Sequence, residues 1–87
     1  MDDIKIEKVK AILTNWNPLG ERAKMVHDLD NYNTEAIDIL FHLDGKPRLE
    51  QVEKMTREIL EESFNIYLSK EDVLPYAKQI HEVLKGK

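Results

Sequence analysis

Residues 47–66, PRLEQVEKMTREILEESFNI, carry the strongest helical pattern in the chain. Opposite charges four residues apart, such as Glu53 and Arg57, occupy one side of this segment, and each such pair stabilises a helix by about 0.2–0.5 kcal/mol without implying a site. We therefore expect an amphipathic helix from Pro47 to about Ile66. Its other side carries apolar residues that recur every three or four positions: Leu49, Val52, Met55, Ile59, Leu60, Phe64 and Tyr67.

Similar spacing on both sides of this segment predicts three more helices, and no run of four or more residues alternates as a strand would. The chain is therefore expected to be all-α, a compact array or bundle of four main helices plus a short irregular or helical segment at about residues 17–32. We expect one domain over residues 1–87. The predicted caps are Asp2 or Asp3 for the first helix, Asn33 or Thr34 for a helix through Leu43, and Ser69 for the last.

The helical pattern leaves the structure undecided at two places, residues 17–32 and Pro75. A structureless loop over residues 17–32 would be unusually long, so a short helix near residues 21–29 is expected, burying Met25, Val26 and Leu29. Pro75 lies too deep for the first helical position if Ser69 is the cap. Either the last helix is kinked there, or its main part starts at Pro75 after a separate first turn.

The composition excludes several classes of protein. The chain has 87 residues and no cysteine, which excludes a disulfide scaffold, a thiolate metal cluster and a cysteine nucleophile. No apolar run approaches the roughly 18 residues that span a bilayer, and the first residues are acidic where a signal peptide would be basic. We expect a cytoplasmic protein that does not bind membranes. Both a monomer and a homodimer are compatible with a domain of this size.

The charge is unevenly distributed along the chain. The formal net charge is −4, and residues 1–45 hold nine Asp or Glu against five Lys or Arg. From Met25 to Gly45 there is no Lys or Arg at all. A nucleic-acid binder needs cations to neutralise phosphates, so DNA and RNA are disfavoured as partners. Such a stretch is either a solvated surface that keeps the protein soluble or a surface that meets a basic patch on another protein.

Residues 34–44, placed on a helix, suggest a candidate site. At 100° per residue, Glu35, Asp38 and His42 fall within an arc of about 60°, opposite Ile37, Leu40 and Phe41. This strip is either an ordinary wet helix face, a protein-binding surface, or a divalent-metal site with Asp38, His42 and Glu35 as ligands. No residue context indicates catalysis, and no cofactor is expected. The candidate residues for contact with a protein partner are Asp30, Tyr32, Glu35, Asp38 and His42.

Two aromatic residues have more than one interpretation. Trp16 falls with Val9 and Leu13 on a helical wheel, which favours a core anchor over an exposed contact. Tyr32 either packs under the 17–32 segment or presents its hydroxyl beside Glu35. Asn17-Pro18 ends or redirects the first helix, because a residue before proline disfavours the helical conformation.

Four short motifs of the chain are Trp16-Asn17-Pro18-Leu19, Asp30-x-Tyr32-x-x-Glu35-x-x-Asp38-Ile39, Ser63-Phe64 and Ala77-x-x-Ile80-x-x-x-Leu84. Together they resemble the YugE-like family of small bacterial proteins found in bacilli and relatives. The likeness spans about residues 9–84, and it implies an all-helical fold without an activity, substrate or cofactor. The family pattern usually has Trp-Asp-Pro where this chain has Trp16-Asn17-Pro18, so the neutral Asn17 favours a structural cap over a metal-binding or acidic role.

The sequence therefore predicts a small non-catalytic protein-binding or regulatory module that meets a basic partner through an acidic helix face. The alternative is a divalent-metal-dependent protein with its site on the 34–44 helix.

Overall fold

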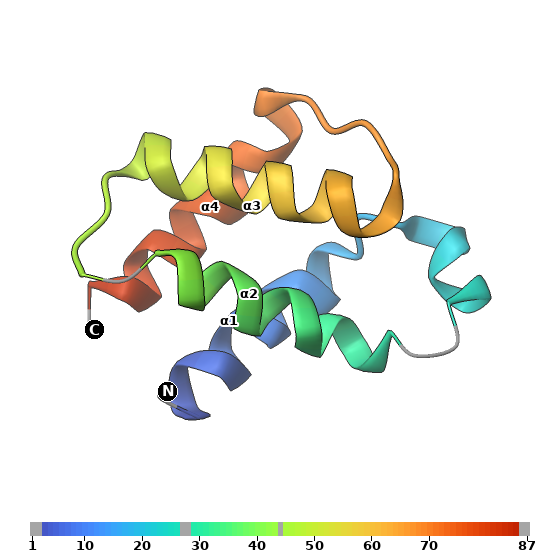
Figure 1. Cartoon of the computed structure of the whole chain (residues 1–87), viewed down its shortest axis with the longest axis horizontal. Helices are drawn as coiled ribbons and strands as arrows, with labels where there is room; N and C mark the ends of the chain where they lie inside the picture. The colour runs from blue at the N-terminus through green and yellow to red at the C-terminus, as the bar shows by residue number, and fades with distance from the viewer. Residues whose placement is uncertain (1–2, 27–28, 44, 86–87) are drawn as a thin grey trace.

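The computed structural model describes residues 3–26, 29–43 and 45–85. These residues form four α-helices, two short 3₁₀ segments and no strand, so the all-α prediction is confirmed (Figure 1). The elements are α1 (Asp3–Trp16), η1 (Gly20–Met25), η2 (Asp30–Tyr32), α2 (Asn33–His42), α3 (Leu49–Phe64) and α4 (Lys70–Leu84).

Each α-helix packs on two others. Helix α1 contacts α2 and α4, and α3 contacts the same two helices from the other side. In Figure 1, α2 and α3 lie in front of α1 and α4. The η2 turn packs on both α1 and α2. The shared core is made of side chains from every α-helix; its completely buried members are Val9, Leu13, Ala36, Ile39, Val52, Leu60, Val73, Ala77 and Ile80.

Helix α3 is slightly shorter than the predicted 47–66 segment. It starts after Arg48, whose backbone N–H donates to Gln51 Oε1 at 2.8 Å, and it ends at a left-handed Asn65 with φ of 52°. Both ends therefore satisfy backbone groups that a helix terminus leaves open.

The two faces of α3 differ from the predicted pattern at two positions. Glu53, expected on the charged outer face, is 2% exposed, and its Oε2 accepts a 2.7 Å bond from Arg57 Nε. Tyr67, expected to extend the apolar stripe, lies beyond the helix and is 86% exposed. A wheel that assumes one buried face fails here because α3 is covered by both α2 and α4.

Helix α4 begins as predicted and continues through its proline. Ser69 Oγ accepts a 3.1 Å bond from the Asp72 N–H, which confirms the cap. The helix runs from Lys70 to Leu84 with Pro75 inside it, so the alternative in which the main helix starts at Pro75 is wrong. Pro75 lacks the N–H that would bond to the Glu71 carbonyl, which removes one helical hydrogen bond.

The segment between α1 and α2 starts with a tight turn. Asn17 ends α1 in a left-handed conformation with φ of 51°, and its N–H donates to the Leu13 carbonyl at 2.8 Å. The Gly20 N–H then donates to the Asn17 carbonyl at 2.8 Å, with Pro18 at the second position of this turn. Asn17-Pro18 therefore stops one helix and starts the next turn.

The predicted helix near residues 21–29 is instead the shorter η1, and residues 27 and 28 lie outside the described residues. Val26 and Leu29 are half-buried against the core. Met25 was predicted to be buried as well, and this prediction is wrong, because its side chain is 78% exposed.

Three consecutive residues before α2 have positive φ angles. Asp30, Asn31 and Tyr32 lie at 45°, 53° and 65°. A left-handed conformation costs an ordinary residue about 1–2 kcal/mol, and only Gly, Asn and Asp adopt it readily. The turn is held by the Tyr32 N–H, which donates to the Leu29 carbonyl at 3.0 Å, and by Thr14 Oγ1, which donates to the Asn31 carbonyl at 3.0 Å.

This turn also changes how α2 begins. The N-cap position is held by the left-handed Tyr32, which makes no side-chain cap bond, and Asn33 is already helical. The prediction that Asn33 or Thr34 caps this helix is therefore wrong.

The left-handed turn predicts a stabilising substitution. Asn31→Gly should raise the free energy of unfolding by about 0.5–1 kcal/mol, because glycine adopts positive φ without steric cost and the Asn31 contact shown here uses its backbone carbonyl. Asn33→Gly is the matched control and should lower stability, since Asn33 is helical with φ of −60°. Urea denaturation measures both, and a loss of stability in both variants would contradict the turn geometry.

A second prediction concerns the buried Thr56 of α3. It is 0% exposed, and its Oγ1 has no hydrogen-bond partner in the described part of the chain. Thr56→Val should raise the free energy of unfolding by about 1 kcal/mol, because it removes a desolvated hydroxyl and keeps the shape. Thr56→Ser keeps the hydroxyl and loses the methyl group, so it should destabilise. A higher melting temperature for Thr56→Ser than for Thr56→Val would refute this prediction.

Candidate functional site

The side of helix α2 that is buried differs from the side that the sequence predicted to be buried. Its buried residues are Glu35, Ala36, Ile39 and Leu40, because α1, η2 and α3 all pack against it. The expectation that Glu35, Asp38 and His42 share one open face is therefore wrong for Glu35, which is 7% exposed. Asp38 is half-buried and His42 is exposed. Phe41, expected on the buried side, is 63% exposed.

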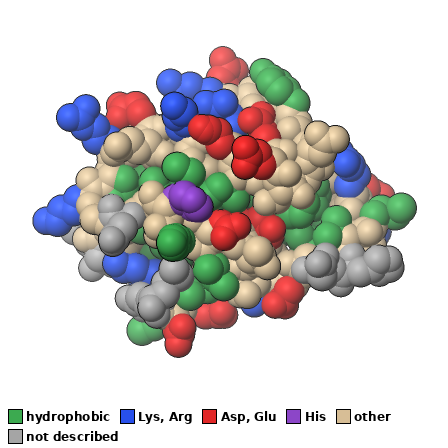
Figure 2. All heavy atoms as spheres, in the orientation of Figure 1, with side chains coloured by type: hydrophobic (Ala, Val, Ile, Leu, Met, Phe, Trp, Pro, Cys, Tyr) green, Lys and Arg blue, Asp and Glu red, His purple; other side chains and the backbone are tan. Residues whose placement is uncertain are grey.

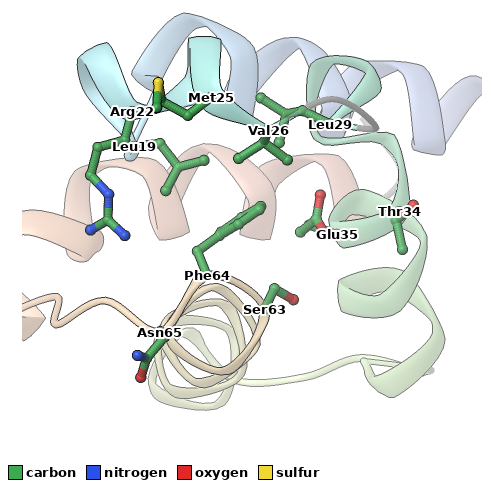
Figure 3. A pocket seen from close by; sticks show the side chains of 10 residues that line it. All are labelled: Leu19, Arg22, Met25, Val26, Leu29, Thr34, Glu35, Ser63, Phe64 and Asn65. Carbon is green, nitrogen blue, oxygen red and sulfur yellow. The ribbon is translucent and has the colours of Figure 1, made fainter.

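Glu35 instead lines an open groove of about 530 Å³ between η1, the start of α2 and the end of α3. We call it the η1–α3 groove (Figure 3). Its middle is apolar and its two ends are polar. The apolar lining comes from Leu19, Met25, Val26, Leu29 and Phe64, and the polar lining from Arg22, Thr34, Glu35, Ser63 and Asn65.

The positive and the negative side chain of the groove lie at its opposite ends. Figure 3 shows Arg22 and Glu35 at opposite ends, with Leu19 and Phe64 between them. Arg22 is exposed, whereas Glu35 Oε1 is shielded from solvent. A carboxylate in such a wall interacts more strongly with a cation than a surface carboxylate does, because less water screens it.

Tyr32 joins the elements that form the groove. Its hydroxyl donates to Asn17 Oδ1 at 2.6 Å and accepts from the Leu19 N–H at 3.3 Å. Its ring meets Phe64 edge-on, with ring centres 5.9 Å apart. Of the two interpretations of Tyr32, the structure supports packing under the 17–32 segment, and the residue is 2% exposed. Tyr32 therefore positions two lining residues, Leu19 and Phe64.

The contacts of Tyr32 adjoin the end of α1, where the chain reads Trp16-Asn17-Pro18. Trp16 is half-buried and stacks on Tyr76 of α4, with ring centres 4.5 Å apart and planes 7° from parallel. Asn17 Nδ2 donates to the Gly20 carbonyl at 3.2 Å while its Oδ1 accepts from Tyr32. The contacts of Trp16 and Asn17 therefore hold the end of α1 against α4 and the following turn.

The remaining candidates lie apart from the groove. His42 Nδ1 bonds to the backbone carbonyl of Asp38 at 2.8 Å, and its ring meets Phe41 at 5.5 Å. Asp30 is exposed in the left-handed turn. Within residues 3–26, 29–43 and 45–85, no three His, Cys, Asp or Glu side chains gather as a metal site would require. The metal interpretation of Asp38, His42 and Glu35 therefore lacks a complete ligand set there.

Charged side chains of both signs lie on the face that carries α2 and α3. In Figure 2, most Lys and Arg side chains of this face lie toward the left and upper left, with Asp and Glu side chains among them, and further Asp and Glu side chains lie near the centre. The ion pairs Arg57–Glu53 and Lys85–Glu82 each join residues three or four positions apart in the sequence, and neither includes a residue of the acidic 25–45 stretch.

Comparison with known proteins assigns neither a family nor a function to the chain. No family model, curated protein or solved structure matches the chain. The resemblance to the YugE-like family therefore stays a prediction. Among the helices the structure describes, none combines the length and the apolar character needed to cross a bilayer.

The Tyr32 contacts predict a pH-dependent loss of stability. Burial raises the pKa of Tyr32 above its ordinary value of 10.0, the Leu19 hydrogen bond opposes this, and the charge of Glu35 raises it further. A pKa raised on folding gives stability that is fully present below the unfolded value and lost as pH rises through the folded value. The free energy of unfolding of the wild type, measured by urea denaturation, should therefore fall as the pH rises above about 10.

Tyr32→Phe removes this titration and should flatten the alkaline slope. At neutral pH it should lower the free energy of unfolding by about 1–3 kcal/mol, because Asn17 Oδ1 and the Leu19 N–H lose their partner. Tyr67→Phe, at an 86% exposed position, is the control and should leave stability at neutral pH unchanged. Parallel pH profiles for the wild type and Tyr32→Phe would refute the assignment.

Proposed function

We propose that this chain is a small non-catalytic binding or regulatory module that captures another protein through the η1–α3 groove. The observation that carries the proposal is the groove itself: about 530 Å³ of space, an apolar middle, and the buried Glu35 carboxylate in its wall. Met25 borders the groove and is 78% exposed. Flexible methionines are common on surfaces that adapt to partners.

The charge of the surrounding chain supports a basic partner. Residues 25–45 contain no Lys or Arg, and their acids include Asp30 and Asp38 besides Glu35. Such a field attracts a positively charged surface and repels acidic ones, so it acts on the association rate and on specificity. The partner we propose is a protein with basic and apolar side chains, met in the cytoplasm. The binding surface is thus a groove with one buried carboxylate rather than an open acidic strip.

A substitution at the rim of the groove tests this. Met25→Lys should reduce capture of native partners from a cell lysate at least about tenfold, because it removes apolar contact and adds a like charge to a basic partner. The fold should be unaffected, since Met25 is largely in solvent. Quantitative mass spectrometry of the captured proteins measures the effect, and circular dichroism checks the helical content.

Ile4→Lys is the matched control. Ile4 lies on α1, outside the groove lining, and is 67% exposed, so the same chemical change occurs on another surface. A photo-crosslinking residue placed at position 25 should also capture the partner, while one at position 4 should not. Equal capture by Met25→Lys, Ile4→Lys and the wild type would reject the groove as the binding surface.

A further inference from the structure

The η1–α3 groove has a direction as well as a volume. Arg22 and Asn65 lie at one end, and Glu35, Thr34 and Ser63 lie toward the other (Figure 3). An apolar floor between opposite charges matches a ligand that carries a cation and an anion separated by apolar groups. A ligand laid the other way would place like charges together at both ends, which is costly.

We propose that the groove binds one amphipathic helix of a partner protein in a single direction. The partner's Lys or Arg lies at Glu35, its Asp or Glu lies at Arg22, and apolar side chains between them fill the space beside Leu19 and Phe64. This inference rests on the proposed function, because it names the chemistry and orientation of the segment that the groove would take.

The secondary structure favours a helix as the occupant. A partner strand needs an exposed sheet edge to pair with, and the part of the chain that the structure describes contains no strand. A groove of about 530 Å³ holds a few side chains from one helix face. Residues one or two turns apart on that face lie about 5–11 Å apart along the axis, which lets one helix present both charges and the apolar residues between them.

The two charged ends contribute differently. Glu35 is 7% exposed, so a cation that reaches it leaves water and forms a contact that is strongly sensitive to removal of either partner. A carboxylate has several acceptor positions, so Glu35 can receive an ammonium or guanidinium in addition to its contacts within the protein. Arg22 is exposed, and an ion pair there is worth little to affinity. Glu35 therefore sets affinity, and Arg22 mainly sets direction.

A displayed library of 14-residue helical peptides with one randomised face is the probe. The full chain is the target, and binders that also bind Met25→Lys are removed. The expected winners carry Lys or Arg one or two turns from Asp or Glu, with apolar residues between them, and the order of the two charges along the helix is the same in nearly all. Winners without a charge preference, or with both orders equally frequent, overturn the inference.

A double-mutant cycle with the strongest peptide then assigns each charge. Replacing its cation by Gln should weaken binding about tenfold to the wild type and not to Glu35→Gln. Replacing its anion by Gln should weaken binding two- to threefold to the wild type and not to Arg22→Gln. Arg22→Gln tests the anion independently of whether Glu35→Gln folds, because Arg22 is on the surface. Losses that persist unchanged in both protein variants refute the pairing.

The two proposals fail in different ways. Peptides that need Met25 but show no charge order would overturn the directional inference and leave the groove as a docking site. Native partners that bind Met25→Lys as well as the wild type would overturn the groove itself, and the directional inference with it.

Discussion

The arrangement of the groove depends on how Tyr32 is held. Its hydroxyl bonds to Asn17 and to the backbone of Leu19, and its ring packs against Phe64. These contacts connect the end of α1, the turn after it, the start of α2 and the end of α3. A buried phenol must keep its hydrogen bonds, because an unsatisfied polar group in the interior costs about 1–3 kcal/mol. One side chain thus fixes Leu19 and Phe64, which line the groove, relative to each other.

The same residue explains why an unfavourable backbone is tolerated. Tyr32 is the third of three left-handed residues, and a bulky aromatic residue seldom adopts positive φ. Such conformations persist only where the surroundings determine them more strongly than local preference does. Here the surroundings are the Tyr32 contacts and the bond from Thr14 to the Asn31 carbonyl. The helix that follows begins from this turn, so the placement of Glu35 in its first turn depends on it as well.

The sequence predicted those parts that depend on local chemistry. The stripe of α3 and the Ser69 cap follow from spacing and from one side-chain bond, and both are present. The cap of α2 was not predictable, because Tyr32 carries no sequence signal for positive φ. Helical wheels misplaced Glu35 and Phe41, since a wheel assumes one buried face and α2 has neighbours on several sides. The groove brings together residues from three separate elements, which periodicity within one element cannot show.

Glu35 and Met25 contribute to the groove in different ways. Glu35 is 7% exposed in the wall of the groove, and the 78% exposed Met25 leaves apolar surface in water at its border. Under the proposed function, a cationic, apolar segment of the partner would cover both side chains. Net negative charge acts differently, because salt screens it within about 8–10 Å at physiological ionic strength. Under the proposed function, the acids of residues 25–45 therefore attract a partner only once it is within about 8–10 Å, and Glu35 selects it on contact.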